Sequence, residues 1–355
     1  MRKPSEWSAG RILGGAFGLE LPADFGGAAA PFFGPEAQYF LSARCALLAL
    51  CAAHRPGTAW LPSYLCGSIR EPFVRSRVPI RYYGLDESLR VSGTDWTQEI
   101  RAGDLVLVIH YFGFPNATFP FDGVLSRGAL LVEDASQALF LPRQFRESVS
   151  ILYSPRKFLG VPDGGVMLSD GGSRLAPDSL DEPPRSWWRS AVAMALKRRE
   201  FDLTGRPNDW HKLFQRVEAT FPVGPYRASD LSRMLISSAD FDEIRKRRRA
   251  NYARLLELLG QYALFPELAG DVVPLGFPVR VEPGIRNQVL WKLHHRRIYA
   301  PLHWPINGVV PESFHPSHGL ASSCLTLICD QRCSLDDMDR QAGVFLAAAA
   351  RRAAV

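Results

Sequence analysis

A lysine and an aspartate stand at positions from which they could act together on one carbonyl cofactor. Lys157 follows the apolar segment 148–153, and Asp134 lies 23 positions before Lys157, at the end of another apolar segment. An amine can hold a carbonyl compound as a Schiff base, and a carboxylate can keep a ring nitrogen protonated so that the ring withdraws electrons. The pair therefore indicates a pyridoxal 5'-phosphate site in which Lys157 is the catalytic residue. Taken singly, Lys157 could be a surface cation, and Asp134 could cap a helix over 135–140.

Short apolar runs predict the strands that would bring these residues together. Three runs that end in polar residues are typical of buried parallel strands, at 104–110, 128–134 and 148–153. Because the carboxyl ends of parallel strands meet at one edge of a sheet, we expect Asp134, Gln137 and Lys157 to lie near one another. A fourth run, 164–168, follows a Pro- and Gly-rich turn that could return the chain antiparallel.

The remaining periodicity predicts an α/β fold with two domains. We expect a large cofactor-binding domain over 1–230, with a mostly parallel sheet flanked by helices, and a smaller α+β domain with a long connecting helix over 231–355. Helical spacing and apolar runs predict helices at 42–54, 186–199, 209–219, 239–259, 285–295 and 335–350, and strands at 272–281 and 326–328.

Seven segments between about Phe40 and Arg340 resemble, in order, the DegT/DnrJ/StrS sugar aminotransferases, a group of fold type I pyridoxal phosphate enzymes. They are Ser42–Leu47, Leu61–Tyr64, His110–Gly113, Glu133–Gln137, Lys157–Gly160, Arg227–Asp230 and Pro301–His303. The resemblance implies that Lys157 is the Schiff-base lysine, that Asp134 pairs with the ring nitrogen, and that Gln137 donates to the phenolic oxygen. It also implies a transaminase that moves an amino group from glutamate to a keto-sugar nucleotide in polysaccharide or secondary-metabolite biosynthesis, as a homodimer.

Further residues could hold the cofactor, and each has a simpler alternative. Ala43 and Arg44 begin a helix whose backbone N–H groups and positive dipole end suit a phosphate, or they belong to an ordinary capped helix. Tyr64 could stack on the cofactor ring or pack in the core. His110 closes an apolar strand and could line the cleft or be a hydrogen-bonded core histidine.

Three positions depart from the family pattern. The serine that helps to bind the phosphate, five residues before the lysine, is Leu152; a ring-stacking aromatic is Cys66; and an asparagine that reaches the neighbouring subunit's phosphate is Pro225. Ser154 could compensate at the phosphate. Arg227 could also reach the phosphate, or it could form an ion pair with an acidic neighbour.

Two other classes of function stay open because of these departures. One is a family variant that binds the cofactor but uses a non-sugar substrate or eliminates; the family's dehydratases replace the lysine by histidine, so Lys157 argues against elimination. The other is a non-catalytic regulatory or scaffolding relative. His303 and Trp304 lie between two prolines and could contact the substrate or simply pack in a loop.

Composition excludes several partners. The chain has 355 residues and a net charge of +6, but the basic run 245–249 lies on the predicted long helix and reads as a solvated face rather than a nucleic-acid site. The apolar stretch 41–53 is too short to span a bilayer and no signal-type segment follows residues 1–7, so we expect a cytoplasmic protein. The six cysteines are expected to be free buried thiols, and no metal site is predicted.

Overall fold

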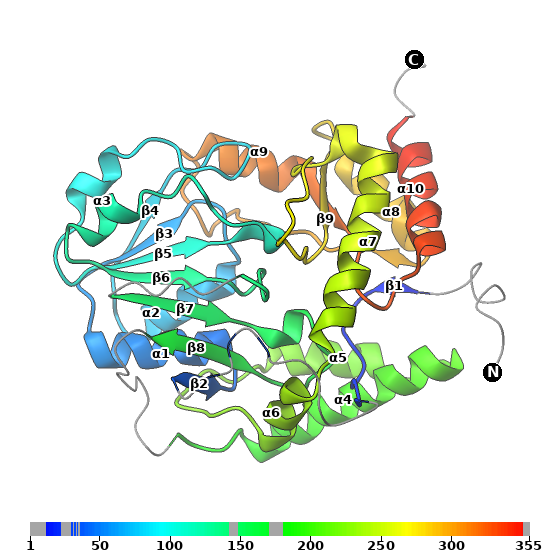
Figure 1. Cartoon of the computed structure of the whole chain (residues 1–355), viewed down its shortest axis with the longest axis horizontal. Helices are drawn as coiled ribbons and strands as arrows, with labels where there is room; N and C mark the ends of the chain where they lie inside the picture. Colours follow the sequence, from blue (N-terminus) through cyan, green and yellow to red (C-terminus); the bar gives the residue numbers. More distant parts are fainter. Residues whose placement is uncertain are drawn as a thin grey trace.

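A seven-stranded sheet forms the centre of the molecule (Figure 1). The computed structural model describes residues 12–22, 30, 32, 34, 36–141, 148–169 and 180–350. Residues 1–7, on which the expectation of a cytoplasmic protein partly rests, lie outside the described part. The strand order is β2-β8-β7-β6-β5-β3-β4. The strands are β2 (Ala37–Phe40), β3 (Ala59–Pro62), β4 (Ile80–Tyr83), β5 (Leu105–Ile109), β6 (Leu130–Asp134), β7 (Val149–Tyr153) and β8 (Gly165–Ser169).

The sheet is parallel except at one strand. Strands β4, β3, β5, β6 and β7 pair in parallel, whereas β8 is antiparallel to both β7 and β2. The three predicted parallel strands and the antiparallel return at 164–168 are therefore confirmed. All five residues of β5 are buried, as expected for a strand covered on both faces.

The first helix begins beside the carboxyl edge of this sheet. Ser42 caps α1 (Ala43–His54) by accepting a hydrogen bond from the Cys45 N–H at 3.3 Å. A Cβ at Gly165 would lie 2.3 Å from the carbonyl carbon of Ser42, so only glycine lets β8 pass the start of α1 this closely. The other helices of this part are α2 (Glu71–Arg75), α3 (Phe121–Leu125), α4 (Arg185–Thr204), α5 (Trp210–Ala219) and α6 (Asp230–Ser237).

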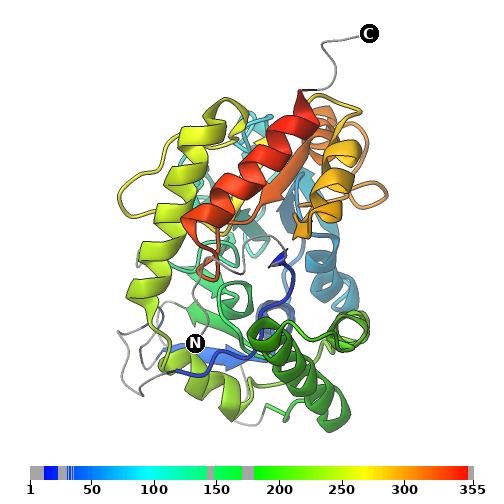
Figure 2. The same ribbon diagram turned by 90° about the vertical axis from the view of Figure 1, so that its right-hand side faces the viewer.

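The C-terminal part is a small α+β unit. Strand β9 pairs antiparallel with β11, and α10 packs against both α7 and α8; the contact of α10 with α7 is visible in both views (Figures 1 and 2). The apolar face of α7 therefore packs within the chain. The elements are α7 (Phe241–Leu259), β9 (Phe277–Arg280), α8 (Arg286–His295), β10 (Ile298–Tyr299), α9 (His315–Ser323), β11 (Cys324–Leu327) and α10 (Leu335–Ala349).

The strand predicted over 272–281 is shorter than expected. Its first half packs on the large part instead of joining β9: the Leu275 N–H donates to the Phe112 carbonyl at 2.8 Å. At the other end of the sequence, β1 (Leu13–Gly14) pairs with β10, so residues 12–22 run between the two parts of the molecule. The domain division at residues 230 and 231 stays a prediction.

The basic run 245–249 is not a wholly solvated helix face, contrary to the sequence prediction. Arg248 is 0% exposed. Its Nε donates to Gln331 Oε1 at 2.8 Å, and its guanidinium lies 4.5 Å from the centre of the Phe158 ring. The reason is helical geometry, because Arg248 follows the buried Ile244 by four positions and so falls on the same face.

No helix in the described part of the chain is long and apolar enough to cross a membrane. The described residues also contain no cluster of three or more histidine, cysteine, aspartate or glutamate side chains that could hold a metal ion. All six cysteines are free thiols, and five of them are buried.

Candidate active site

The strand ends bring the lysine and the aspartate to one edge of the sheet. Asp134 is the last residue of β6 and lies opposite Ile109 of β5 and Leu152 of β7. The chain continues from β7 into a short 3₁₀ helix, η5 (Pro155–Lys157), which carries Lys157. Both functional groups therefore emerge at the carboxyl edge, where open α/β sheets bind ligands.

Asp134 is held by a local turn. Its side chain is 5% exposed, and Oδ1 accepts a hydrogen bond from the Ser136 N–H at 2.8 Å. Residues 135–140 form turns rather than a helix, so the alternative role of Asp134 as a helix cap is wrong. The turn fixes the position of this carboxyl group at the end of a buried strand.

Gln137 presents a donor that the protein does not use. Its Oε1 accepts a hydrogen bond from the Phe112 N–H at 2.8 Å, which fixes the orientation of the amide. Its Nε2 is buried and has no hydrogen-bond partner among the described residues. Because a buried donor without a partner costs about 1–3 kcal/mol, this N–H group is expected to serve a ligand.

Lys157 is half-buried and lines a cavity of about 500 Å³. The cavity lies between the turn that carries the lysine, the N-terminal segment, α4 and α5, and the C-terminal part. Its lining includes Gly14–Phe17, Ser154, Met194, Phe214, Tyr299, His303 and Thr326. The lysine therefore faces a space that is large enough for a small molecule.

His303 lies in this cavity as a neutral ring. Its Nδ1 is 2.8 Å from Thr326 Oγ1, and its ring packs edge-on against Phe112 with 5.3 Å between centroids. Burial, together with the positive charge of Lys157, lowers the pKa of His303 to about 3. At neutral pH the ring can exchange hydrogen bonds but carries no charge.

Trp304 and Tyr64 belong to an aromatic cluster beside His303. The Tyr64 ring lies 5.6 Å from Trp304 and 6.1 Å from Tyr111, centroid to centroid. Tyr64 is 1% exposed, and burial raises the pKa of its hydroxyl well above its ordinary value. The structure thus packs Tyr64 as a neutral core aromatic in this region.

His110 has no free ring nitrogen. The Asn116 N–H donates to Nδ1 at 3.0 Å, so Nε2 carries the hydrogen and donates to Glu133 Oε2 at 2.9 Å. All three residues are buried. Of the two interpretations of His110, the geometry favours the hydrogen-bonded core histidine.

The residues expected near the phosphate are only partly available. Arg44 Nη1 donates to Glu71 Oε2 at 2.8 Å, and the Cys45 N–H donates to Ser42, which leaves the backbone N–H groups of Ala43 and Arg44 at the start of α1 for an anion. Leu152 is 0% exposed and belongs to the apolar core, whereas Ser154 lines the cavity. Arg227 Nη1 donates to Asp230 at 2.8 Å. Of the two roles considered for Arg227, this is the ion pair with an acidic neighbour.

Cys66 stands where the family has a ring-stacking aromatic, and a contact of Cys66 with the cofactor stays a prediction. The thiol is partly exposed, and its Sγ lies 3.1 Å from Ser68 Oγ at the start of a short 3₁₀ helix, Gly67–Arg70. It takes no part in the aromatic contacts of Tyr64 and Trp304.

Sequence reasoning missed an ion pair in the same cavity. Arg332 Nη2 and Asp330 Oδ2 are 2.7 Å apart, and both residues line the cavity. Burial alone would raise the pKa of Asp330, but Arg332 outweighs it and holds that pKa well below its usual range. The pair follows β11, more than 170 positions after Lys157, and no local pattern marks it.

Solved aminotransferases, some of them named as sugar aminotransferases, share this architecture. TlmJ from Streptoalloteichus hindustanus matches at a TM-score of 0.64 and 17% identity, over 89% of this chain and 86% of that one. A protein named as a sugar aminotransferase from Streptococcus pneumoniae, in its PMP form, matches at 0.64 and 12%, over 89% and 87%. A DegT DnrJ EryC1 StrS aminotransferase from Brucella abortus matches at 0.60 and 16%, over 89% and 86%.

No protein-family model matches the chain, and no curated protein matches it. At these levels of identity the likeness concerns the arrangement of the chain rather than its chemistry. The chain has the fold of the sugar aminotransferases, a mostly parallel α/β sheet with a smaller C-terminal unit.

Proposed function

We propose that this chain is a pyridoxal 5'-phosphate-dependent aminotransferase of the DegT/DnrJ/StrS type. In this proposal it moves an amino group from glutamate to a keto-sugar nucleotide in the cytoplasm, in polysaccharide or secondary-metabolite biosynthesis. The observation that carries the proposal is that Lys157 faces a cavity while Asp134 and Gln137 lie at the same sheet edge. The fold shared with sugar aminotransferases, one of them solved in a PMP form, supports it.

The residues present fit the cofactor ring. Asp134 would pair with the ring nitrogen, and the phenolic oxygen would supply the partner that the buried Gln137 Nε2 lacks. Backbone N–H groups at Ala43 and Arg44, with Ser154, would hold the phosphate. When bound, the cofactor supplies an electron sink for negative charge on a substrate carbon.

The chain's own residues would perform the proton transfers. Lys157 Nζ would be the base that takes a proton from one carbon and returns it to another. Asp134 holds the proton at the ring nitrogen. The neutral His303 can orient a polar group of the substrate without adding a second positive charge beside Lys157.

A homodimer is part of the proposal. With Leu152 apolar and Arg227 paired with acidic residues, the phosphate has few side-chain contacts from its own chain, and a second subunit could add them. Leu196 and Leu203 of α4 are 48% and 65% exposed and offer an apolar surface for such a partner. Sedimentation of the wild type and of Leu203→Glu tests this: a monodisperse, active wild-type monomer contradicts it.

The direct test of the proposal is to locate the cofactor. The protein is incubated with pyridoxal phosphate, reduced with borohydride, digested and analysed by mass spectrometry. The expected result is a mass increment on the peptide that contains Lys157, and its loss in Lys157→Ala. A label on another lysine, or none, contradicts the assignment.

The second candidate function is that of a non-catalytic relative that binds the cofactor. An absorption spectrum recorded before and after adding glutamate distinguishes it from an aminotransferase. This candidate is favoured by Leu152, Cys66 and Pro225, where the family's functional side chains are absent. An aminotransferase converts glutamate to 2-oxoglutarate as the absorption band of the bound cofactor disappears. Retention of the cofactor with no 2-oxoglutarate supports the non-catalytic role.

A further inference from the structure

We propose that Glu20, Gln331 and Arg248 form a bracket that holds the turn carrying Lys157, and that Glu20 and Gln331 are positioning residues for this lysine. The bracket is defined by these three residues. The inference rests on the proposed role of Lys157, and it concerns residues that lie outside the catalytic groups named above.

Gln331 is the centre of the bracket. Its Nε2 donates to the Phe158 carbonyl at 2.6 Å and to Glu20 Oε1 at 3.2 Å, and its Oε1 accepts from Arg248 Nε at 2.8 Å. The side chain is 9% exposed. The amide therefore joins the residue directly after Lys157 to two other segments of the chain.

Glu20 forms hydrogen bonds to the same turn at Gly160, two residues after Phe158. Its Oε2 accepts a hydrogen bond from the Gly160 N–H at 2.8 Å, and its own backbone N–H donates to the Gly160 carbonyl at 2.9 Å. A Cβ at Gly160 would come within 1.9 Å of the Gly18 carbonyl oxygen, so this close approach requires glycine. Burial raises the pKa of Glu20, although the hydrogen bond from the Gly160 N–H acts to lower it.

Arg248 closes the bracket from α7. Besides its bond to Gln331, its Nη1 donates to the carbonyls of Pro274 at 3.1 Å and Leu275 at 2.9 Å. Its guanidinium packs on the ring of Phe158, which is 0% exposed. The backbone and the side chain of Phe158 are thus both fixed.

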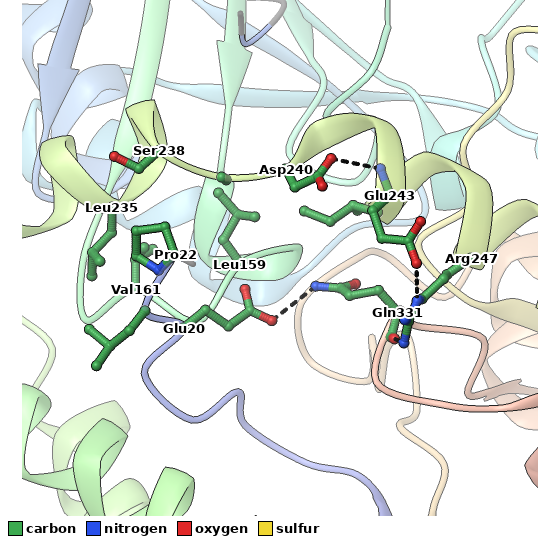
Figure 3. A pocket seen from close by; sticks show the side chains of 13 residues that line it. Glu20, Pro22, Leu159, Val161, Leu235, Ser238, Asp240, Glu243, Arg247 and Gln331 are labelled. Atoms are coloured by element: carbon green, nitrogen blue, oxygen red, sulfur yellow. Dashed lines mark hydrogen bonds and ion pairs between the residues drawn. The ribbon is translucent and has the colours of Figure 1, made fainter. Parts of the chain in front are cut away.

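The arrangement has the geometry of a wall between two cavities. A second hollow of about 460 Å³ shares Leu159 and Val161 with the cavity of Lys157 and is also lined by Glu20, Gln331, Glu243 and Arg247. Figure 3 shows Glu20 and Gln331 joined by their hydrogen bond in the lining of this hollow, with Leu159 close to Glu20. Leu159, in the turn that follows Lys157, lines both cavities. A shift of the bracket would therefore move this turn and, with it, Lys157.

Positioning follows from the number and the origin of these contacts. The turn after Lys157 is bound by the N-terminal segment, by α7 and by the loop after β11, which are distant in sequence. Reaction rates fall steeply when a reacting amine is displaced by an ångström, so fixing the backbone at Phe158 and Gly160 fixes where Nζ can reach.

Two single variants and their combination test the bracket. In Gln331→Glu a second carboxylate faces Glu20 and the donor to Phe158 is lost. In Glu20→Gln the amide at position 20 can still accept from Gly160, but its N–H groups face the Gln331 donor. The double variant Glu20→Gln/Gln331→Glu restores a donor–acceptor pair between positions 20 and 331. Glu243→Gln is the matched control, because Glu243 lines the same hollow and bonds to Arg247 but not to the turn.

The first readouts use the protein without cofactor. Amide hydrogen exchange should accelerate at Gly160 about tenfold or more in Gln331→Glu, less in Glu20→Gln, and recover in part in the double variant. Pulse acetylation with acetic anhydride, read by mass spectrometry, should give a changed rate at Lys157 in the same order. Glu243→Gln should match the wild type in both measurements.

With cofactor and glutamate, the rate constant of the glutamate reaction should fall in the same order while the dissociation constant for glutamate stays within twofold. Unchanged exchange at Gly160 and unchanged acetylation at Lys157 in a folded Gln331→Glu protein would overturn the proposal; if that variant does not fold, the same outcome in Glu20→Gln overturns it. A failed borohydride label in the wild type overturns the proposed function instead, because it does not affect the exchange measurement.

Discussion

Replacing His303 by glutamine should remove an acid-sensitive contribution to stability. The folded ring resists protonation, with a pKa lowered from 6.5 to about 3, whereas in the unfolded chain it should titrate near 6.5. Since the folded pKa is depressed, the contribution is fully present above pH 6.5 and is lost progressively as the pH falls toward 3. Glutamine cannot titrate, so the unfolding free energy of the variant lacks this dependence on pH.

The expected magnitude follows from the two pKa values. At pH 5 the unfolded ring is largely protonated and the folded ring is not, which costs the wild type about 2 kcal/mol of unfolding free energy relative to pH 7. Any folded pKa below about 4 gives nearly the same figure. The value is therefore insensitive to the partial exposure of His303.

The measurement is urea unfolding of wild type and His303→Gln at pH 7, 6 and 5. The difference in stability between the two proteins should change by about 2 kcal/mol across this range in favour of the variant, because all other titrating groups are shared. His54→Gln, at the exposed end of α1, is the control variant for a histidine outside the cavity. A constant difference between wild type and His303→Gln at all three pH values would refute the reasoning that the His303 ring stays neutral in the folded protein.

Three further outcomes are expected. Arg248→Met should lower the unfolding free energy by about 3 kcal/mol in urea titrations, because the acceptors of its hydrogen bonds lose their donor, whereas the exposed Arg245→Met should change it by less than about 0.5 kcal/mol. Gly165→Ala should lower the thermal midpoint through its clash with the start of α1, while Gly343→Ala, with open space around it inside α10, should raise stability by about 0.5–1 kcal/mol. Asp134→Asn should keep the fold by circular dichroism and retain some cofactor, yet slow the glutamate reaction by orders of magnitude in single-turnover absorbance; an unchanged rate would leave Asp134 a structural role only.

The sheet could be read from the sequence because its strands are continuous apolar runs. The boundaries predicted for β5, β6 and β7 agree with the structure within two residues. Because these strands are buried on both faces, they are continuous apolar runs rather than alternating apolar and polar residues, and polar residues mark where each strand ends. The same logic placed Asp134 and Lys157 at one edge.

The second layer of the site could not be read in this way. Arg248 looks like one cation among five basic residues, and only helical phase relative to Ile244 would have indicated its burial. Glu20 and Gln331 have no local signal, because their partners are backbone groups of a turn far away in the chain. Contacts of this kind depend on tertiary packing rather than on any periodicity.

The crossing of residues 12–22 between the two parts of the molecule has a consequence for synthesis on the ribosome. Leu13 pairs with Ile298, and Glu20 meets Gln331, 311 positions later in the chain. The central sheet can form from residues 37–169, but the turn at Lys157 gains its last supports only when the loop after β11 has left the exit tunnel. Long-range contacts of this kind close slowly, because the entropy of the intervening chain opposes them. The nascent protein should therefore hold a formed sheet with an unfinished lysine turn through the later part of its translation, and competence to retain a ligand should arise at the end of synthesis.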